Sequence, residues 1–374
     1  MTTPRQRIFL AGAAAFAILA STLWGAAASA GATAATPWQQ GLAHCMTVAP
    51  VVCSFDVPPG DYEIRLALGS RTAPAATGIQ VEARRTVLAP VSTRAGQIVA
   101  ESVTVSVRTP ESMPDGQEGP GTPGLQVYLT GAAPALAGIQ VSPRPRVPRL
   151  LVISDSTAAD WLNGPKRGWA QELPQLFGPG LSVANYGDSG SSTVSWLANP
   201  ALFAAVEPLI RPGDEVLVQL AHNDKTTPEA TYRANLLTIT GRIRARGGLP
   251  VLVTPPVRHL FGPDGKITPT GRIVNNLGVD LPAVMRDIAA TSHIPLLDLT
   301  ADSEHLVESL GSTASWQLYL GTTVVPTDAT HFNEHGATVI AGLVAREITA
   351  ARLPAAVFLR GQAAATGRDG ERGP

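Results

Sequence analysis

The sequence predicts a two-part protein, in which a smaller all-β sandwich precedes a larger three-layer α/β/α part built on a parallel sheet. At 374 residues the chain is long for one domain and comfortable for two. Its first half consists of short strands separated by turn residues, whereas its second half alternates strands with helical periodicity. Between the halves, the proline-spaced segment 143–148 is expected to be a stiff, extended linker.

The first 30 residues are typical of a secretory signal peptide. Arg5 and Arg7 precede an apolar run over 8–23, and Ala28-Ser29-Ala30 is a small-residue cleavage site. An uncleaved membrane anchor is the alternative, but the run is shorter than the ~20 residues that a span needs. We therefore expect a secreted or periplasmic protein with no membrane contact after cleavage. Its net charge of −1 argues against nucleic-acid binding.

The β-sandwich is predicted over 37–142 because its apolar runs are short and several alternate with polar residues. Cys45 and Cys53 are the only cysteines, with seven residues between them. In an oxidising compartment they would form a disulfide across a hairpin, and two buried free thiols are the alternative. No Cys/His spacing indicates a metal site. The expected strands are 51–57, 62–68, 79–88, 101–107, 125–129 and 139–141.

The α/β part is predicted over 149–352. The apolar run 150–153 is too short for a helix and is typical of a strand buried on both faces. Strands and helices in alternation imply a parallel sheet covered on both sides. Residues 353–374 show no periodicity and are expected to form a loose tail. Further strands are expected at 181–185, 215–220, 250–254 and 294–299, and helical stripes at 232–243, 281–288 and 340–348.

Four polar patches follow strands or precede the last helix of this part. They contain Ser156, Gly190, Asn223, and the pair Asp328 and His331. Because the carboxyl ends of parallel strands meet at one edge of a sheet, the patches can converge there. Alone, each patch is better explained as a turn, a helix cap or a surface pair. Four of them in one α/β part favour a catalytic site.

These residue types match what acyl transfer requires. The Ser156 hydroxyl can act as nucleophile, with His331 as its base and Asp328, expected in a short turn, orienting the imidazole. The developing oxyanion needs fixed donors. The amides of Ser156 and Gly190 and the side-chain amide of Asn223 are the candidates. The Ser156 amide is expected near the positive end of a following helix.

The order of these patches resembles that of the SGNH (GDSL-type) hydrolases and is most similar to rhamnogalacturonan acetylesterases. The resemblance covers about 149–352. It rests on Ser154-Asp155-Ser156-Thr157, similar to the family's Gly-Asp-Ser-Thr, on Gly168-Trp169-Ala170-Gln171, similar to Gly-Trp-Gly-Gln, and on Ala221-His222-Asn223-Asp224, similar to Gly-His-Asn-Asp. In the β part, the run from Pro59 to Gly69 resembles galactose-binding-like domains.

The resemblance implies a flavodoxin-like sheet and a Ser-His-Asp esterase without metal or organic cofactor. Its substrate would be an acetylated polysaccharide or oligosaccharide, with pectic rhamnogalacturonan expected first. Asp155, His222 and Trp169 are expected to contribute to substrate binding. Ser191 stands where the family has Arg, so we expect a weaker demand for a negatively charged galacturonate. Ser154 and Ala221 each replace a family Gly, and the latter adds a methyl group to the pocket wall.

Two other functions compete with this interpretation. A lipase- or thioesterase-like hydrolase of longer acyl esters would use the same catalytic residues, although no separate apolar lid is evident. A carbohydrate-binding protein with an inactive hydrolase part is the second alternative. The presence of Ser156, Asp328 and His331 together argues against it.

Overall fold

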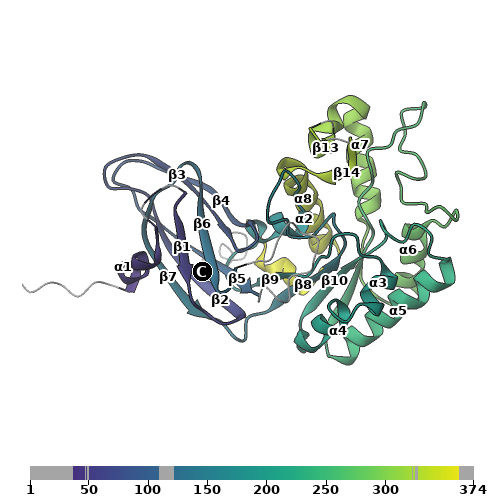
Figure 1. Cartoon of the computed structure of the whole chain (residues 1–374), viewed down its shortest axis with the longest axis horizontal. Helices are drawn as coiled ribbons and strands as arrows, with labels where there is room; N and C mark the ends of the chain where they lie inside the picture. The colour runs from purple at the N-terminus through teal and green to yellow at the C-terminus, as the bar shows by residue number, and fades with distance from the viewer. Residues whose placement is uncertain are drawn as a thin grey trace, which may run out of the picture. The chain divides into compact units, whose positions relative to one another are not determined.

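The computed structural model describes residues 37–46, 48, 50–108, 122–321, 323–324 and 327–361. The predicted signal peptide at 1–30 lies outside these residues. The described residues group into one compact unit. Within it, a β-sandwich part precedes an α/β part (Figure 1).

The sandwich part contains two antiparallel sheets with strand orders β1-β6-β3-β4 and β5-β2-β7. Alternation explains its core: in β2, Ile64, Leu66 and Leu68 are fully buried between the sheets. A disulfide joins Cys45 to Cys53 beside the first strand. The elements are α1 (Pro37–Gly41), η1 (Leu42–His44), β1 (Val52–Phe55), β2 (Gly60–Leu68), β3 (Ala75–Val81), β4 (Arg85–Thr93), β5 (Val99–Val107), β6 (Leu125–Ala133) and β7 (Leu136–Pro143).

The single strand predicted over 79–88 is wrong, because the chain turns between β3 and β4. Glu82 and Arg84 have φ values of 54° and 55°, in the left-handed region. The α/β part holds this turn, since the Gln171 side chain donates to the Ala83 carbonyl and Arg167 Nη1 donates to the Arg84 carbonyl at 2.7 Å. Partners so distant along the chain leave no local signal in the sequence.

The α/β part is built on a parallel sheet with the order β12-β11-β10-β8-β9. Numbered along this part, the order is 2-1-3-4-5, which is the flavodoxin-like arrangement. The first strand, β8, lies inside the sheet between β9 and β10. The strands are β8 (Arg149–Ser154), β9 (Ser182–Asn185), β10 (Glu215–Gln219), β11 (Leu249–Val253) and β12 (Leu296–Leu297).

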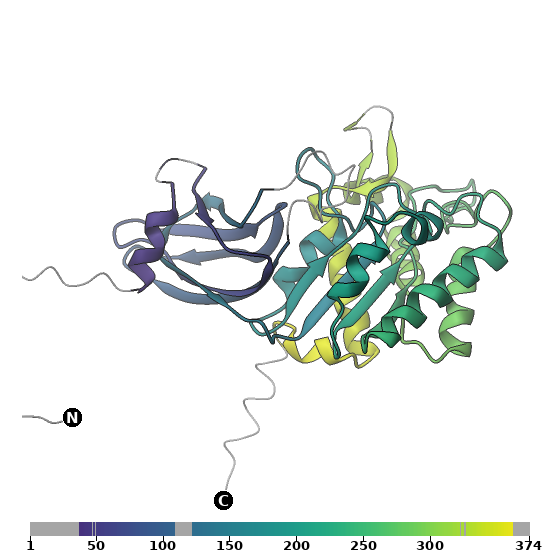
Figure 2. The same ribbon diagram turned by 60° about the horizontal axis from the view of Figure 1, so that its bottom comes forward.

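Helices cover both faces of this sheet, which confirms the predicted three-layer fold (Figure 1 and Figure 2). Leu150 and Val152 of β8 face one core, and Leu151 and Ile153 face the other. One face carries α2 (Trp169–Glu172), η3 (Leu173–Leu176), α7 (Leu299–Ala314), η5 (Ser315–Leu318) and α8 (Glu334–Ala350). The other carries α3 (Thr193–Ala198), α4 (Phe203–Val206), η4 (Glu207–Leu209), α5 (Glu229–Ala245) and α6 (Leu281–Thr291).

Two further predictions differ from the structure. The segment 144–148 is not extended, because it turns where the Val147 amide donates to the Arg144 carbonyl at 3.2 Å. Residues 353–361 are not loose, since η6 (Pro354–Phe358) is bounded by the buried Leu353 and Leu359, which belong to the core beneath α8. The rest of the predicted tail, 362–374, lies outside the described residues.

Candidate active site

The structure brings Ser156, His331 and Asp328 together in one line of hydrogen bonds. His331 Nε2 lies 2.9 Å from Ser156 Oγ, and Nδ1 lies 2.7 Å from Asp328 Oδ2. The second carboxylate oxygen of Asp328 accepts the backbone amides of Thr330 and His331, each at 2.9 Å. A carboxylate can only accept, so Nδ1 keeps its proton and Nε2 is free to accept the serine hydroxyl.

Charge interactions keep Asp328 ionised. Burial raises the pKa of this carboxyl, but the hydrogen bonds from the His331 ring and amide outweigh burial and lower the pKa well below its usual range. Asp328 lies on β14 (Asp328–Phe332), which pairs with β13 (Tyr319–Gly321), and not in the short turn predicted for it. The pairing with β13 supports the strand from which both acid and base project.

Ser156 lies in a turn after β8, at the carboxyl edge of the sheet. The amides of Ala158 and Ala159 both donate to the Asp155 carbonyl at 3.2 Å, so the chain makes a single helix-like turn. The next helix, α2, begins only at Trp169. The expectation that a helix dipole acts on the Ser156 amide is therefore wrong.

Trp161 is a site residue that sequence reasoning missed. Its indole nitrogen donates to the Ser156 carbonyl at 3.1 Å, and its ring meets His331 edge-on at 5.9 Å between centroids. The side chain is buried, so it fixes the nucleophile turn and the base against each other. The available signal was a tryptophan in a short polar segment where no core strand or helix was expected.

The three candidate oxyanion donors lie at the carboxyl ends of neighbouring strands, β8, β9 and β10. Gly190 is exposed with φ of 82°, a conformation that favours glycine, and a Cβ there would meet no atom within 4 Å. One hydrogen of the Asn223 side-chain amide is used by the Ser191 carbonyl at 2.9 Å. That bond holds the Gly190 loop to Asn223 and leaves the second amide hydrogen for a ligand.

Asp155 and Trp169 do not reach a substrate-accessible surface, so the expectation of substrate contact is wrong for these two, whereas the almost completely buried His222 lines only a small cavity beside the site. The exposed fractions of Asp155, His222 and Trp169 are 0%, 3% and 0%. The Asp155 carboxylate accepts from Thr157, Gln219 and the His222 ring, and Trp169 donates to Gln219 at 3.0 Å. Burial raises the pKa of Asp155, but the His222 charge and these donors lower it to about 2. Through these buried hydrogen bonds, the three residues support the nucleophile turn.

Ser191 is also turned inward. Its hydroxyl donates to the Asp188 carbonyl at 2.8 Å and accepts from the Trp196 indole at 2.8 Å. The Ser191 side chain, which stands where the family has Arg, therefore lies inside the protein and not at the substrate surface. The Ser154 hydroxyl fits because the residue that lies against it, Gly187, has no Cβ. A Cβ on Gly187 would lie 2.4 Å from Ser154 Oγ.

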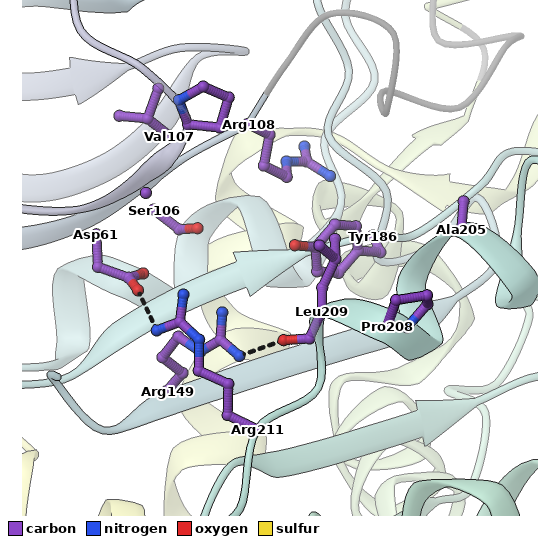
Figure 3. A pocket seen from close by; sticks show the side chains of 12 residues that line it. Asp61, Ser106, Val107, Arg108, Arg149, Tyr186, Ala205, Pro208, Leu209 and Arg211 are labelled. Carbon is purple, nitrogen blue, oxygen red and sulfur yellow. Dashed lines mark hydrogen bonds and ion pairs between the residues drawn. The ribbon is translucent and has the colours of Figure 1, made fainter. Parts of the chain in front are cut away.

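A separate pocket of about 460 Å³ lies where β2 and β5 meet β8 and the residues after α4 (Figure 3). It contains none of the three residues in the catalytic line. Its arginines already have carboxylate partners: Arg108 bonds Asp160 at 2.8 Å, Arg149 bonds Asp214, and Arg211 bonds Asp61 at 3.3 Å. Each arginine of this pocket is therefore paired with a carboxylate, although Arg108 shares Asp160 with Arg85, and its Nε and Nη1 have no hydrogen-bond partner.

A flavodoxin-like sheet that brings a serine, a histidine and an aspartate together at its carboxyl edge is typical of enzymes that hydrolyse acyl esters. Comparison with known proteins agrees. Residues 155–339 match the model of the GDSL-like Lipase/Acylhydrolase family. Rhamnogalacturonan acetylesterase RhgT of Bacillus subtilis (strain 168) is 33% identical over 222 residues, which cover 55% of this chain and 91% of that protein.

Two further relatives extend the comparison. The probable rhamnogalacturonan acetylesterase YesY of the same organism is 27% identical over 214 residues, covering 55% of this chain and 94% of that protein. The crystal structure of protein YxiM from Bacillus subtilis superposes with a TM-score of 0.51 at 21% identity, covering 82% of this chain and 81% of that chain, which shows a shared fold.

The chain therefore belongs to the GDSL-like lipase/acylhydrolase family and is a carboxylic ester hydrolase, as the sequence resemblance predicted. The similarity of the sandwich part to galactose-binding-like domains stays a prediction. In the described ranges, every helix is too short or too polar to cross a bilayer.

Proposed function

We propose that this protein is an exported acetylesterase that removes O-acetyl groups from an acetylated plant cell-wall polysaccharide, with pectic rhamnogalacturonan as the first candidate. The observation that carries the proposal is the hydrogen-bonded line from Ser156 Oγ through the His331 ring to Asp328. The substrate class is supported by the names of the two Bacillus relatives. The signal-like residues 1–30 support export.

In this mechanism Ser156 Oγ attacks the acetyl carbonyl carbon while its proton passes to His331 Nε2. Asp328 stabilises the imidazolium that results. The carbonyl oxygen, now negative, accepts hydrogen bonds from the Ser156 and Gly190 amides and from Asn223 Nδ2. The bond to the sugar oxygen then breaks, and that oxygen takes the proton from His331. Water, deprotonated by His331 in the same way, releases acetate and restores the serine.

An open site suits a polymeric substrate with a small acyl group. The side chains of His331 and Asp328 retain 21% and 17% of their exposure, and Gly190 is exposed. A long acyl chain would instead be bound by a buried apolar surface, where each methylene contributes about 0.8 kcal/mol. Along a series of p-nitrophenyl esters, we therefore expect the rate to fall steeply from acetate to butyrate and to be negligible at octanoate.

The decisive variant is Ser156→Ala. Without a nucleophile, hydrolysis of p-nitrophenyl acetate and acetate release from acetylated pectin should both fall by at least a thousandfold. Ser309→Ala, on the exposed side of α7, is the matched control and should keep parental rates. Residual activity within tenfold of the parent would remove Ser156 from the mechanism. Rates that rise with acyl length would favour the lipase-like alternative instead.

A further inference from the structure

A small cavity is lined by residues on both sides of the oxyanion residue Asn223 in the chain, His222 and Lys225. Its volume is about 50 Å³, which is too small for a sugar ring and large enough for a small polar group. It is formed after β10 and β11 and before α6. The lining residues are Ala221, His222, Lys225, Arg258, Thr270, Ile273, Val274, Asn275, Asn276 and Leu281.

Two of the lining residues, Lys225 and Arg258, are cations. Among the described residues, neither forms an ion pair with a carboxylate, in contrast to the arginines of the larger pocket. Arg258 Nη2 donates to the His222 carbonyl at 2.9 Å, while its buried Nε has no hydrogen-bond partner. A guanidinium group with a buried nitrogen that lacks an acceptor is costly, and an anion in the cavity that Arg258 lines would give this group a partner. Lys225 is exposed and can turn toward the same anion.

Both cations are tied to the catalytic edge. Asn223 lies between the cavity residues His222 and Lys225 in the chain. The amide of His259, next to Arg258, donates to the Ala329 carbonyl at 2.8 Å, which connects the arginine segment to the strand that carries Asp328 and His331. The cavity residues that follow β10 and β11 thus lie at the same edge of the sheet as Ser156, so one oligosaccharide can reach both.

We propose that Lys225 and Arg258 form an anion subsite that binds the carboxylate of a uronic-acid residue in the acetylated oligosaccharide. Guanidinium and ammonium groups are the side chains that bind carboxylates most strongly. The family has an arginine where this chain has Ser191. The subsite would supply positive charge from the residues after β10 and β11 instead. The inference rests on the proposed acetylesterase function, and it replaces the expectation of a weak demand for galacturonate.

The test uses two substrates that differ only in charge: an acetylated galacturonate-containing oligosaccharide, and the same compound with its carboxylates converted to amides. For the full chain, kcat/KM should be at least tenfold higher for the charged substrate. Lys225→Gln should lower this ratio about threefold to fivefold, and Arg258→Gln about tenfold, mainly through KM. Arg258→Lys, which keeps the charge, should recover part of the loss. Lys266→Gln is the control, since that exposed lysine pairs with Glu308 far along the chain.

Added salt supplies a second readout. Because Lys225 is exposed, the preference for the charged substrate should weaken as ionic strength rises. A parental ratio near one, or variants that lower both substrates equally, would overturn the subsite and leave the acetylesterase intact. Equal losses would mean that Arg258 only balances the nearby Asp155 and Asp328 charges. If p-nitrophenyl acetate is hydrolysed but neither oligosaccharide releases acetate, the proposed substrate class and the subsite both fail.

Discussion

His222 illustrates how a buried polar residue supports a catalytic edge through its hydrogen bonds. Its Nδ1 lies 3.1 Å from Asp155 Oδ2, and its Nε2 lies 3.0 Å from the Pro256 carbonyl. Asp155 Oδ2 also accepts from Gln219, so His222 and Gln219 meet at the same carboxylate oxygen. The ring therefore bridges the nucleophile turn and the end of β11, and it fixes the adjacent Asn223.

We expect His222→Phe to show this role directly. A phenyl ring fills similar space but donates nothing, so Asp155 loses a hydrogen-bonding partner inside the protein. Removing one member of a buried pair costs about 3–5 kcal/mol, and we expect the free energy of unfolding in urea to fall by roughly 3 kcal/mol. The kcat for p-nitrophenyl acetate should also fall, by about tenfold or more, because Asn223 loses its support.

His335→Phe is the matched control, since His335 is exposed on α8. It should change the free energy of unfolding by no more than about 0.5 kcal/mol. If His222→Phe unfolds at the same urea concentration as the parent, the buried pair contributes nothing to stability. That outcome would also remove the proposed support of Asn223.

The residues that meet at the site were predictable where chemistry limits the choice of side chain. A serine after a buried strand or an Asp-x-x-His before a helix is weak evidence alone, but their occurrence together indicated a catalytic site, and the structure brings Ser156, Asp328 and His331 together. Substrate contacts were not predictable, because a motif does not reveal which way a side chain points. Trp169 belongs to a family motif and yet is fully buried.

At the scale of elements, the central strand β10 is buried along its whole length, so even its first residue, Glu215, lies in the interior. The Ala355 amide, in the segment after α8, donates a hydrogen bond to the Glu215 carboxyl, and this bond lowers the pKa of Glu215. Burial raises the pKa of Glu215 to about 7, against the opposing effect of that amide. The folded protein therefore holds a proton that the unfolded chain releases near pH 4.5.

This difference predicts a pH-dependent stability. A carboxyl whose pKa is raised on folding stabilises the folded state below its unfolded pKa, and that contribution is lost as pH rises toward the folded pKa. Glu82 and Glu172, also raised to about 7, act in the same direction. The free energy of unfolding should thus decrease between about pH 4.5 and 7. Glu215→Gln should make this decrease smaller and stabilise the protein at pH 8, by at most about 3 kcal/mol.

Thermal unfolding across pH 4.5–8 measures the effect, with Glu229→Gln on exposed α5 as the control that keeps the parental slope. A Glu215→Gln protein with the parental pH dependence would show that this carboxyl titrates normally in the folded state. Asp155 and Asp328 do not change stability between pH 4.5 and 8. Folding lowers their pKa values, so their contribution to the free energy of unfolding is lost only as pH falls below about 4.

Elements were predictable wherever local periodicity determines them. The stripe of Tyr232, Leu236, Ile239 and Ile243 is buried in α5 as its spacing predicts. The turn at Glu82–Arg84 was not predicted, because a residue distant in the chain holds it. The β13–β14 pair was not predicted, because its strands have only three and five residues. Helix α7 was missed because its apolar residues are few, with Leu299 and Val307 as its buried hydrophobics.

At the scale of the whole molecule, the sandwich part contributes charged side chains to the interior of the α/β part. Arg108 Nη2 donates to Asp160 at 2.8 Å, and Arg85 Nε lies 3.4 Å from the same carboxylate. Asp160 also accepts from Asn185 Nδ2 at 2.8 Å. Asp160 is next to Trp161, which donates to the Ser156 carbonyl, so these contacts connect the sandwich to the nucleophile turn.

The prediction at this scale is that the sandwich positions the nucleophile turn as well as covering it. Arg108→Met replaces the guanidinium with an apolar side chain of similar length and leaves Asp160 with fewer partners. Asp160→Asn removes the negative charge from the same ion pair. Both variants should lose roughly 3 kcal/mol of unfolding free energy, because a buried carboxylate or guanidinium is left unpaired. At a temperature where each variant is folded, kcat for p-nitrophenyl acetate should fall by about tenfold with little change in KM, since the nucleophile is displaced while the Gly190 loop and Asn223 are unchanged. Arg346→Met, on the exposed side of α8, should leave both quantities unchanged. A folded Arg108→Met enzyme with parental kcat would show that the sandwich only covers the edge of the sheet.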